Sequence, residues 1–310
     1  MSLLTISDLY VNFPTEDGLV KAVNGVDLSI AESEIVGLIG ESGCGKTILG
    51  LSIMRLLQDE VKIKGDILYR GKNLYSIEIE DMRKLRGKEI GMILQNPGSS
   101  LNPVLTVGFQ IAESFMLHKN VKYNLAIEMA KELLKRVQIK EPGERVKDYP
   151  HQYSGGMKER AVIAMGIASE PYFIIADEPT KGLDITVKRN IVKLLKEISE
   201  KKTMLIITHD LGVAGEVCDR IAVMYAGELV EIAPVTAMFE RQLHPYTRGF
   251  FNSLPARGLK PIKGSSPSLI DLPGGCRFHP RCDHCLEQCK TEHPPMFEKE
   301  ERLVRCFLYA

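Results

Sequence analysis

The 310-residue sequence predicts an α/β fold with a mostly parallel core sheet, an N-terminal antiparallel β subdomain, a helical subdomain and a small cysteine-rich C-terminal extension. Three observations support this prediction. A compact apolar run leads into a glycine-rich loop and a helical stretch. Two later apolar runs that end in acidic or polar residues flank another helical stretch, which is typical of parallel strands buried on both faces. Finally, five of the seven cysteines fall within the last 35 residues.

The first expected element is an antiparallel β unit over residues 3–36 with one buried face. Its apolar residues alternate with polar ones, and Pro14 and Gly18 mark a turn. The alternating residues are Leu4, Ile6, Leu9, Val11, Val23, Val26, Leu28 and Ile30. Residues 34–40 then form a strand ending in glycine and residues 46–57 a helix, which is the first half of a βαβ unit.

The middle of the chain is predicted to be mainly helical. Short strands are expected at 65–68 and 90–95, a loop at 97–103 and helices from about 106 to 170. Leu125, Met129, Leu133 and Val137 recur at every fourth residue, which predicts one apolar helix face. We place the helical subdomain at about residues 97–168.

The later part of the chain returns to strands and ends in an irregular tail. Strands are expected at 172–176 and 204–208 with a helix at 185–198 between them, and a hairpin at 221–224 and 229–232. Beyond about residue 245, proline, glycine, serine and cysteine dominate. The predicted domains are residues 1–250 and a cysteine-rich extension over 251–310.

Composition and charge exclude several classes of protein. Apolar residues make up 44% and charged residues 26%, as in an ordinary folded soluble chain. Lys plus Arg and Asp plus Glu are both 40, so the basic excess of a nucleic-acid binder is missing. No run approaches the roughly 20 apolar residues that span a bilayer, and residues 1–17 do not resemble a signal peptide. We therefore expect a cytosolic chain that does not bind nucleic acid.

Residues 40–47 fit the pattern G-x-x-x-x-G-K-[ST], as Gly40-Glu41-Ser42-Gly43-Cys44-Gly45-Lys46-Thr47, between the expected strand and helix. Backbone N–H groups of such a loop cradle phosphate oxygens, and the following helix adds its positive end. Lys46 would reach the β- and γ-phosphates of ATP, Thr47 would ligate Mg²⁺, and Ile48 completes the binding set. The alternative is a strand-to-helix turn without a ligand. Cys44 is interpreted as a small loop residue, although a helix N-terminus can lower a thiol pKa.

Asp177 and Glu178 follow the apolar run at 172–176. A carboxylate at the end of a parallel strand faces the edge of the sheet where ligands bind. Asp177 would hold Mg²⁺, directly or through water, and Glu178 would orient the attacking water. This division suits phosphoryl transfer, which depends on positioning and charge neutralisation. The alternative is that the two acids only cap the next helix.

Six motifs in this order resemble those of ATP-binding-cassette (ABC) ATPases, P-loop NTPases, over about residues 3–245. They are the loop at 40–47, Gln95, Ser154-Gly155-Gly156, Asp177-Glu178, Gly182-Leu183-Asp184 and His209. Within this family the chain is similar to the D-type ATPase subunits of oligopeptide and dipeptide importers. The closer similarity is carried by Gln95-Asn96-Pro97, Ser100-Leu101-Asn102-Pro103, Ser154-Gly155-Gly156-Met157, His244-Pro245-Tyr246-Thr247-Arg248 and the cysteine tail.

The resemblance implies roles for several residues to which the local sequence pattern assigns no role. Phe13 would stack on adenine, Gln95 would sense Mg²⁺ and the lytic water, and His209 would contact the γ-phosphate. Ser154-Gly155-Gly156 would be the signature motif, in which a serine caps a helix and glycines bring N–H groups to the γ-phosphate bound by a second ATPase subunit. Asp184 would line the seam between the two subunits. Two departures are Tyr153, where the family usually has Leu, and Lys181-Gly182, where Thr-Ala is more common.

The tail has the spacing Cys276-x5-Cys282-x2-Cys285-x3-Cys289-x16-Cys306. In a cytosolic chain clustered cysteines often hold zinc or an iron–sulfur cluster, and the Cys282-x2-Cys285 spacing alone favours zinc. The resemblance implies instead a [4Fe–4S] cluster on Cys276, Cys282, Cys289 and Cys306, with Cys285 outside the set. Zinc and free thiols or disulfides remain alternatives.

The resemblance also implies partners. These are two transmembrane permease subunits, gripped by residues 96–107 and the helical stretch that follows, and a second ATPase subunit that is paralogous or identical. An exported solute-binding protein would take part indirectly, and the chain would lie on the cytoplasmic face of the membrane. The solute would be a dipeptide or oligopeptide, with nickel chelates, oligosaccharides or a non-transport ABC function as alternatives.

Overall fold

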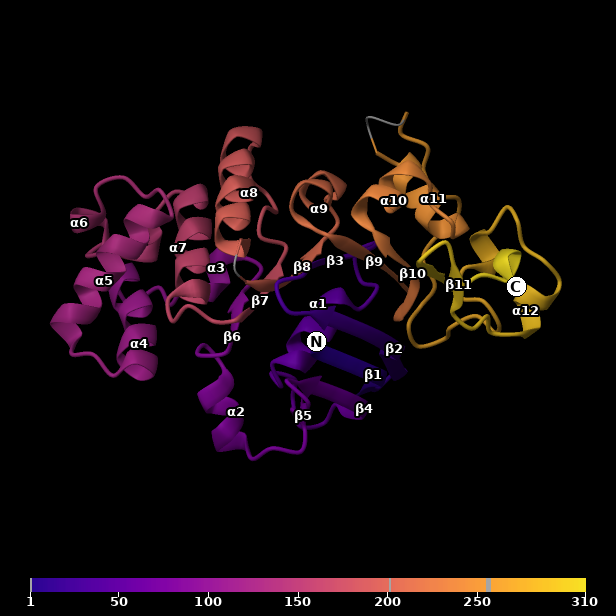
Figure 1. Ribbon diagram of the computed structural model, residues 1–310, viewed down its shortest axis with the longest axis horizontal. Coiled ribbons are helices and arrows are strands. Elements are labelled where there is room, and N and C mark those ends of the chain that lie inside the picture. The colour runs from indigo at the N-terminus through magenta and orange to yellow at the C-terminus, as the bar shows by residue number, and fades with distance from the viewer. Residues whose placement is uncertain (1, 201, 255–257) are drawn as a thin grey trace. The chain divides into compact units, whose positions relative to one another are not determined.

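A computed structural model describes residues 2–200, 202–254 and 258–310 of the chain. The chain divides into two compact units, one formed by residues 1–76 and 207–310 and the other by residues 77–206 (Figure 1). The tail therefore belongs to the same unit as the N-terminal strands and the phosphate loop, and the predicted helical subdomain lies within the other unit. Among the described residues, no helix is both long and apolar enough to cross a bilayer.

The N-terminal sheet of the first unit is antiparallel, as predicted. It consists of β1 (Ser2–Thr15), β2 (Gly18–Ala31), β4 (Lys62–Tyr69) and β5 (Lys72–Asn73), in the order β2-β1-β4-β5. Alternating apolar residues such as Leu9 and Val26, which pair across β1 and β2, are fully buried. The alternation read from the sequence is thus the side-chain period of a strand with one core face.

The second sheet of this unit carries the phosphate loop. β3 (Ile35–Ile39) pairs in parallel with β9 (Arg220–Tyr225), which forms the predicted hairpin with β10 (Glu228–Pro234). The tail, for which the sequence predicted no strand, adds β12 (Arg302–Val304) and β11 (Phe297–Lys299) at the far edge of β10. The helices of the unit are α1 (Lys46–Ile53), α9 (Leu211–Val217), α10 (Val235–Glu240), α11 (Pro245–Asn252) and α12 (Gln288–Thr291).

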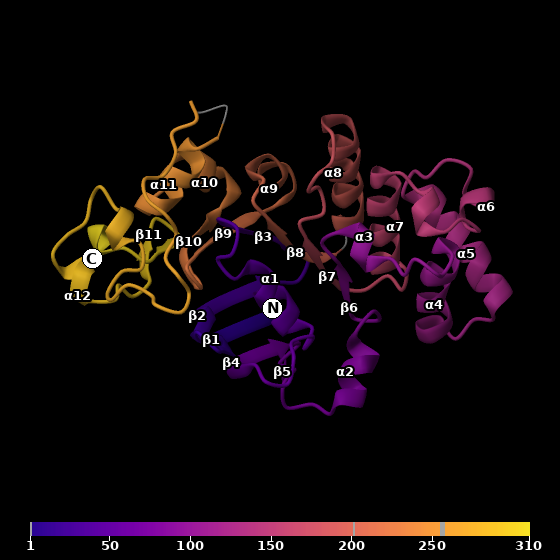
Figure 2. The same cartoon turned by 180° about the vertical axis from the view of Figure 1, so that it is seen from behind.

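The other unit is mainly helical. Its strands β6 (Ile90–Ile93) and β7 (Phe173–Asp177) pair in parallel, and β8 (Thr203–Thr208) runs across the division between the units. α4, α5 and α6 lie together in both views (Figures 1 and 2). The helices are α2 (Ile79–Leu85), α3 (Pro97–Ser100), α4 (Val107–Lys119), α5 (Tyr123–Arg136), α6 (Pro142–Arg145), α7 (Gly155–Ile167) and α8 (Ile185–Ser199).

Two helix predictions need correction. α1 ends at Ile53 instead of residue 57, because Arg55 adopts a left-handed φ of 48°. The segment at 97–103, predicted as a loop, begins with the single helical turn α3.

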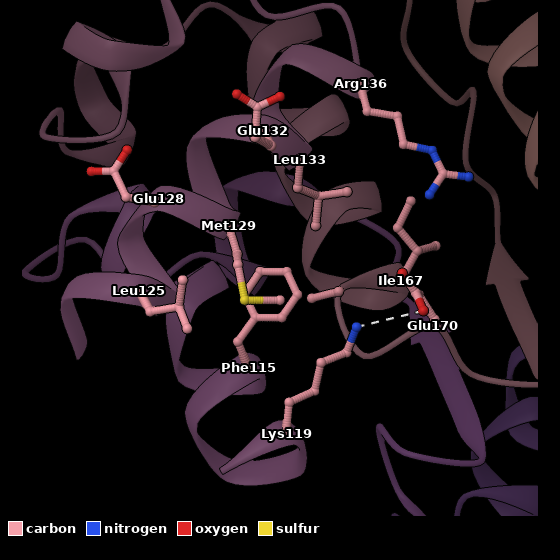
Figure 3. Close-up of a pocket in the computed structure, with 11 residues that line it drawn as sticks. Phe115, Lys119, Leu125, Glu128, Met129, Glu132, Leu133, Arg136, Ile167 and Glu170 are labelled. Atoms are coloured by element: carbon pink, nitrogen blue, oxygen red, sulfur yellow. Dashed lines mark ion pairs between the residues drawn. The ribbon is translucent and has the colours of Figure 1, made fainter. Parts of the chain in front are cut away.

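The buried face of α5 also differs from the predicted one. Its core residues are Ala126, Ala130, Leu133 and Leu134, whereas Leu125 is 54% exposed. A strict four-residue repeat drifts around a helix of 3.6 residues per turn, so Leu125 lies away from the buried face to which Leu133 belongs. Leu125, Met129 and Leu133 instead line a cavity of about 620 Å³ together with Phe115 (Figure 3). Lys119 and Glu170 also line this cavity and form an ion pair of 3.5 Å (Figure 3).

Candidate functional site

The loop between β3 and α1 can be built only with glycine at its two ends. Gly45, the N-cap of α1, has a φ of 109°, and a Cβ there would lie 2.1 Å from the carbonyl oxygen of Ala22. A Cβ on Gly40 would lie 2.2 Å from the carbonyl oxygen of Met224. Both contacts are too short for any side chain, so the glycines let the loop curl against neighbouring backbone.

Lys46 is held inside this loop. Its side chain is buried, and its Nζ donates hydrogen bonds of 2.9 Å to the carbonyl oxygens of Gly40 and Glu41. Thr47 and Ile48 follow in the first turn of α1 and are half-buried. The sequence placed Lys46 and Thr47 at a strand–loop–helix junction, and they lie at one.

Cys44 is a packed loop residue, as the sequence analysis interpreted it. Its thiol is buried, and burial raises its pKa above the usual value even though the neighbouring ammonium of Lys46 acts to lower it. Its carbonyl oxygen accepts a 3.0 Å bond from the N–H of Gly227 in the β9–β10 hairpin. Cys44 is thus a packed loop residue without the lowered thiol pKa that its place before α1 suggested.

The strand-end acids lie at the end of β7. Asp177, the last residue of that strand, is 1% exposed, and Glu178 is 9% exposed. Glu178 adopts a φ of 49°, a left-handed conformation that is uncommon for residues other than glycine. Strained backbone conformations of this kind occur most often at functional sites. They persist there because the surrounding structure holds the residue in place.

Ser154 caps α7 as the sequence predicted. Its Oγ accepts a bond from the N–H of Met157 at 3.4 Å, and Gly155 and Gly156 form the first turn. A Cβ on Gly155 would meet nothing within 4 Å, so the backbone there is open to a ligand. Tyr153, the departure from the family pattern, is buried, and its hydroxyl donates a 2.9 Å bond to the carbonyl oxygen of Arg145. This hydrogen bond therefore connects the segment before the signature motif to the backbone at Arg145.

The remaining predicted residues take these positions. Asp184 caps α8, accepting bonds of 3.0 Å from the N–H groups of Thr186 and Val187. Gln95 lies two residues beyond β6 and is half-buried, and Phe13 is a half-buried residue of β1. His209 is exposed between β8 and α9. The predicted nucleotide residues divide between the units: Phe13, residues 40–48 and His209 belong to the first, and Gln95, residues 154–156, Asp177, Glu178 and Asp184 to the second.

The tail cysteines predicted as a set share one cavity. Cys276, Cys282, Cys289 and Cys306 line it, and Cys285 does not. Burial raises the pKa of Cys276 to about 12 and that of Cys282 to about 11. All seven cysteines lie within the described residues and are free thiols. Across residues 2–200, 202–254 and 258–310, no three His, Cys, Asp or Glu side chains form a group that could hold a metal ion.

The sequence did not reveal one group of contacts to the loop. The N–H of Glu41 donates a 2.9 Å bond to the hydroxyl of Tyr246, and the Glu41 carboxylate pairs with Arg281 and accepts a bond from Ser266. These partners lie more than 200 residues away in the chain, so no local pattern could signal them. Tyr246 belongs to the motif at 244–248, which the resemblance had singled out without a role.

The chain carries a glycine-rich loop after a parallel strand, acids at the end of a second strand and a serine-capped glycine pair, the features from which the sequence predicted an ATPase. The family profile described as ABC transporter matches residues 23–181, and the one described as oligopeptide/dipeptide transporter, C-terminal region, matches residues 230–289. The chain belongs to the ABC transporter ATPases. This confirms the predicted fold class and the ATPase activity.

Known relatives extend over nearly the whole chain. The oligopeptide transport ATP-binding protein AppD of Bacillus subtilis is 44% identical over 318 residues, covering 99% of this chain and 97% of that protein. The dipeptide transport ATP-binding protein DppD of the same organism is 42% identical over 316 residues, covering 99% and 94%. Among solved structures, the dimeric post-hydrolysis state of the ATP-binding cassette MJ0796 bound to ADP and Pi has a TM-score of 0.68 at 26% identity, covering 77% of this chain and 100% of that one.

Proposed function

We propose that this ATPase is the motor subunit of a membrane importer for dipeptides or oligopeptides. The observation that carries the proposal is similarity to peptide-transport ATP-binding proteins over 99% of the chain, with a separate match of the tail region to the peptide-transporter profile.

Nucleotide binding is assigned to the phosphate loop. Lys46 Nζ, which bonds the carbonyl oxygens of Gly40 and Glu41, would exchange these partners for β- and γ-phosphate oxygens. The hydroxyl of Thr47, the amide of Gln95 and the carboxylate of Asp177 are hard oxygen donors of the kind that Mg²⁺ prefers. Bound there, Mg²⁺ would neutralise charge that develops on the phosphate oxygens. Phe13 would stack on the adenine.

Hydrolysis is assigned to Glu178. The water oxygen attacks the γ-phosphorus, the bond from that phosphorus to the ADP oxygen breaks, and the Glu178 carboxylate accepts a proton from the water. His209 would contact the γ-phosphate. Ser154, Gly155 and Gly156 would close on ATP held by a second, paralogous or identical ATPase subunit, with Asp184 at the seam.

We propose a [4Fe–4S] cluster in the tail. Four thiols, those of Cys276, Cys282, Cys289 and Cys306, line one cavity, and four cysteines are the usual ligand set of such a cluster. The side chains of the described residues form no ready metal site, so a bound cluster would have to draw these four sulfurs together. Ligation requires thiolates, so a bound cluster would displace the protons that burial retains on these thiols. When bound, it would cross-link a tail too short to form its own core.

The partners follow from the proposed task. Two permease subunits would contact residues 96–107 and α4, and the chain would be attached peripherally to the cytoplasmic face of the membrane. A solute-binding protein outside would deliver the peptide. Co-purification of the tagged chain with two membrane subunits tests this assignment, and recovery of the chain with no membrane protein would contradict it.

Glu178→Gln tests the catalytic assignment. We expect ATP binding to be retained and turnover to fall about 10²–10⁴-fold, the usual contribution of a general base. The measurements are fluorescent-nucleotide titration and phosphate release under single-turnover conditions. The exposed residue Glu197 of α8 offers the control Glu197→Gln, which should hydrolyse ATP normally. Normal turnover in Glu178→Gln would refute the role of Glu178.

The cluster is tested by anaerobic purification. We expect brown protein with about four iron and four sulfide per chain, lost in Cys289→Ser and retained in Cys285→Ser. If the wild type is colourless and carries stoichiometric zinc, the cluster assignment is wrong and the site binds zinc.

A further inference from the structure

The tail reaches the phosphate loop through a paired arginine. Arg281 Nη1 lies 3.1 Å from one oxygen of the Glu41 carboxylate, and Nη2 lies 3.3 Å from the other, so the contact is bidentate. The Arg281 side chain is 7% exposed and that of Glu41 is 25% exposed. A forked, largely buried pair of this kind is stronger and more directional than a surface ion pair.

Aromatic side chains hold Arg281 in place. Its guanidinium lies 5.8 Å from the ring centre of Tyr225 and 5.9 Å from that of Phe278. Tyr225 in turn packs on Tyr246, with ring centres 4.4 Å apart. Because Tyr246 accepts the backbone N–H of Glu41, the same cluster grips both the backbone and the side chain of this loop residue.

The segment between Cys276 and Cys282 holds the backbone of Arg281 in a fixed turn. Arg281 ends a short 3-10 helix, His279–Arg281, that lies between Cys276 and Cys282. The N–H of His279 donates to the carbonyl oxygen of Cys276 at 3.0 Å, and the N–H of Cys282 donates to that of His279 at 3.2 Å. The arginine is therefore carried by a closed turn of the tail.

We propose that Arg281 is a positioning residue for nucleotide binding, which holds the phosphate loop through Glu41 and makes ATP affinity depend on the tail. Glu41 is the first residue after Gly40, and its carbonyl oxygen is one of the two partners of Lys46 Nζ. A displaced Glu41 would move this carbonyl and bring an unneutralised carboxylate toward the triphosphate. The inference rests on the nucleotide role of the loop and holds whatever the tail cysteines bind.

A double-mutant cycle tests the proposal. Affinity for a fluorescent ATP analogue is measured for the wild type, Arg281→Gln, Glu41→Gln and the double variant. We expect Arg281→Gln to weaken binding about tenfold in the wild type and to have little further effect in the Glu41→Gln background, because contacting residues are coupled. Arg281→Lys, which keeps the charge and loses the fork, should be intermediate.

Arg305→Gln is the matched control. Arg305 is also a tail arginine, but it donates to the carbonyl oxygens of Leu229 and Pro294 and to no phosphate-loop residue. It should bind nucleotide as the wild type does, even if its melting temperature falls. Unchanged affinity in Arg281→Gln overturns the positioning role of Arg281 but not the nucleotide role of the loop. An equal loss of affinity on adding Arg281→Gln to the wild type and to Glu41→Gln does the same. A wild type that binds no nucleotide overturns the function of the loop as well.

Discussion

A buried carboxylate next to the signature motif predicts an unusual dependence of stability on pH. Glu159 lies in α7, the helix that begins with Gly155 and Gly156, and it is 2% exposed. Burial raises the pKa of its carboxyl group to about 7. Glu159→Gln keeps the shape of the side chain and removes the ionisation, so it isolates the cost of the charge.

The size and sign of the effect follow from linkage. A pKa raised from the ordinary 4.5 to about 7 means that the folded state binds more protons than the unfolded state between these pH values. Stability from this group is therefore greatest at low pH and is lost as pH rises from about 4.5 to about 7. At about 1.4 kcal/mol per pKa unit, the charged carboxylate costs about 3 kcal/mol above pH 7, and most of this cost develops between pH 5 and 8.

The assay is urea unfolding of wild type and Glu159→Gln at several pH values. The chain has no tryptophan and ten tyrosines, so circular dichroism and tyrosine fluorescence are suitable probes. The difference in unfolding free energy between the two proteins should grow in favour of Gln from pH 5 to pH 8. The exposed control Glu197→Gln should show no such trend. A difference that stays constant across this range would refute the reasoning.

Three further predictions concern the nucleotide machinery and its support. Lys46→Ala should abolish measurable ATP binding in a fluorescence titration, and retained affinity would argue against the phosphate cradle. Ser154→Ala should cost about 1 kcal/mol of unfolding free energy by removing the α7 cap, and should also slow ATP hydrolysis; a variant with normal turnover would contradict the signature role. Tyr153→Phe should cost about 1 kcal/mol through the lost bond to Arg145, with ATPase activity close to wild type, so a large loss of activity would show that the tyrosine does more than brace.

Local chemistry explains which features the sequence could predict. A glycine loop needs its own glycines and the adjacent strand and helix, so β3, residues 40–47 and α1 could all be inferred from neighbouring residues. The predicted cap formed by Ser154 is similarly local, since it bonds an N–H group within three residues. The cap formed by Asp184 is equally local but was not predicted. The hairpin of β9 and β10 followed from two apolar runs around a short turn.

Features that depend on tertiary contact were missed. The buried face of α5 is decided by what packs against Ala126 and Ala130, and spacing alone favoured Leu125. Burial raises the Cys44 pKa and outweighs the neighbouring ammonium of Lys46, which acts to lower it. The contact of Glu41 with Arg281 joins positions 240 residues apart, beyond the reach of any local pattern.

The tail illustrates how a short, irregular segment becomes ordered. With about 60 residues it buries a smaller fraction of its surface than a larger domain does, so a core of its own would be only marginally stable. It instead shares one: Val304 and Cys306 are buried against Leu243, and the hydroxyl of Tyr309 donates a 3.0 Å bond to the carbonyl oxygen of Leu243. The predicted boundary near residue 250 therefore separates segments that share a hydrophobic cluster. The same tail also carries Arg281 and Ser266, which both contact the Glu41 carboxylate. A change in the tail that displaces these two side chains is therefore expected to weaken nucleotide binding, whereas one that leaves them in place is not.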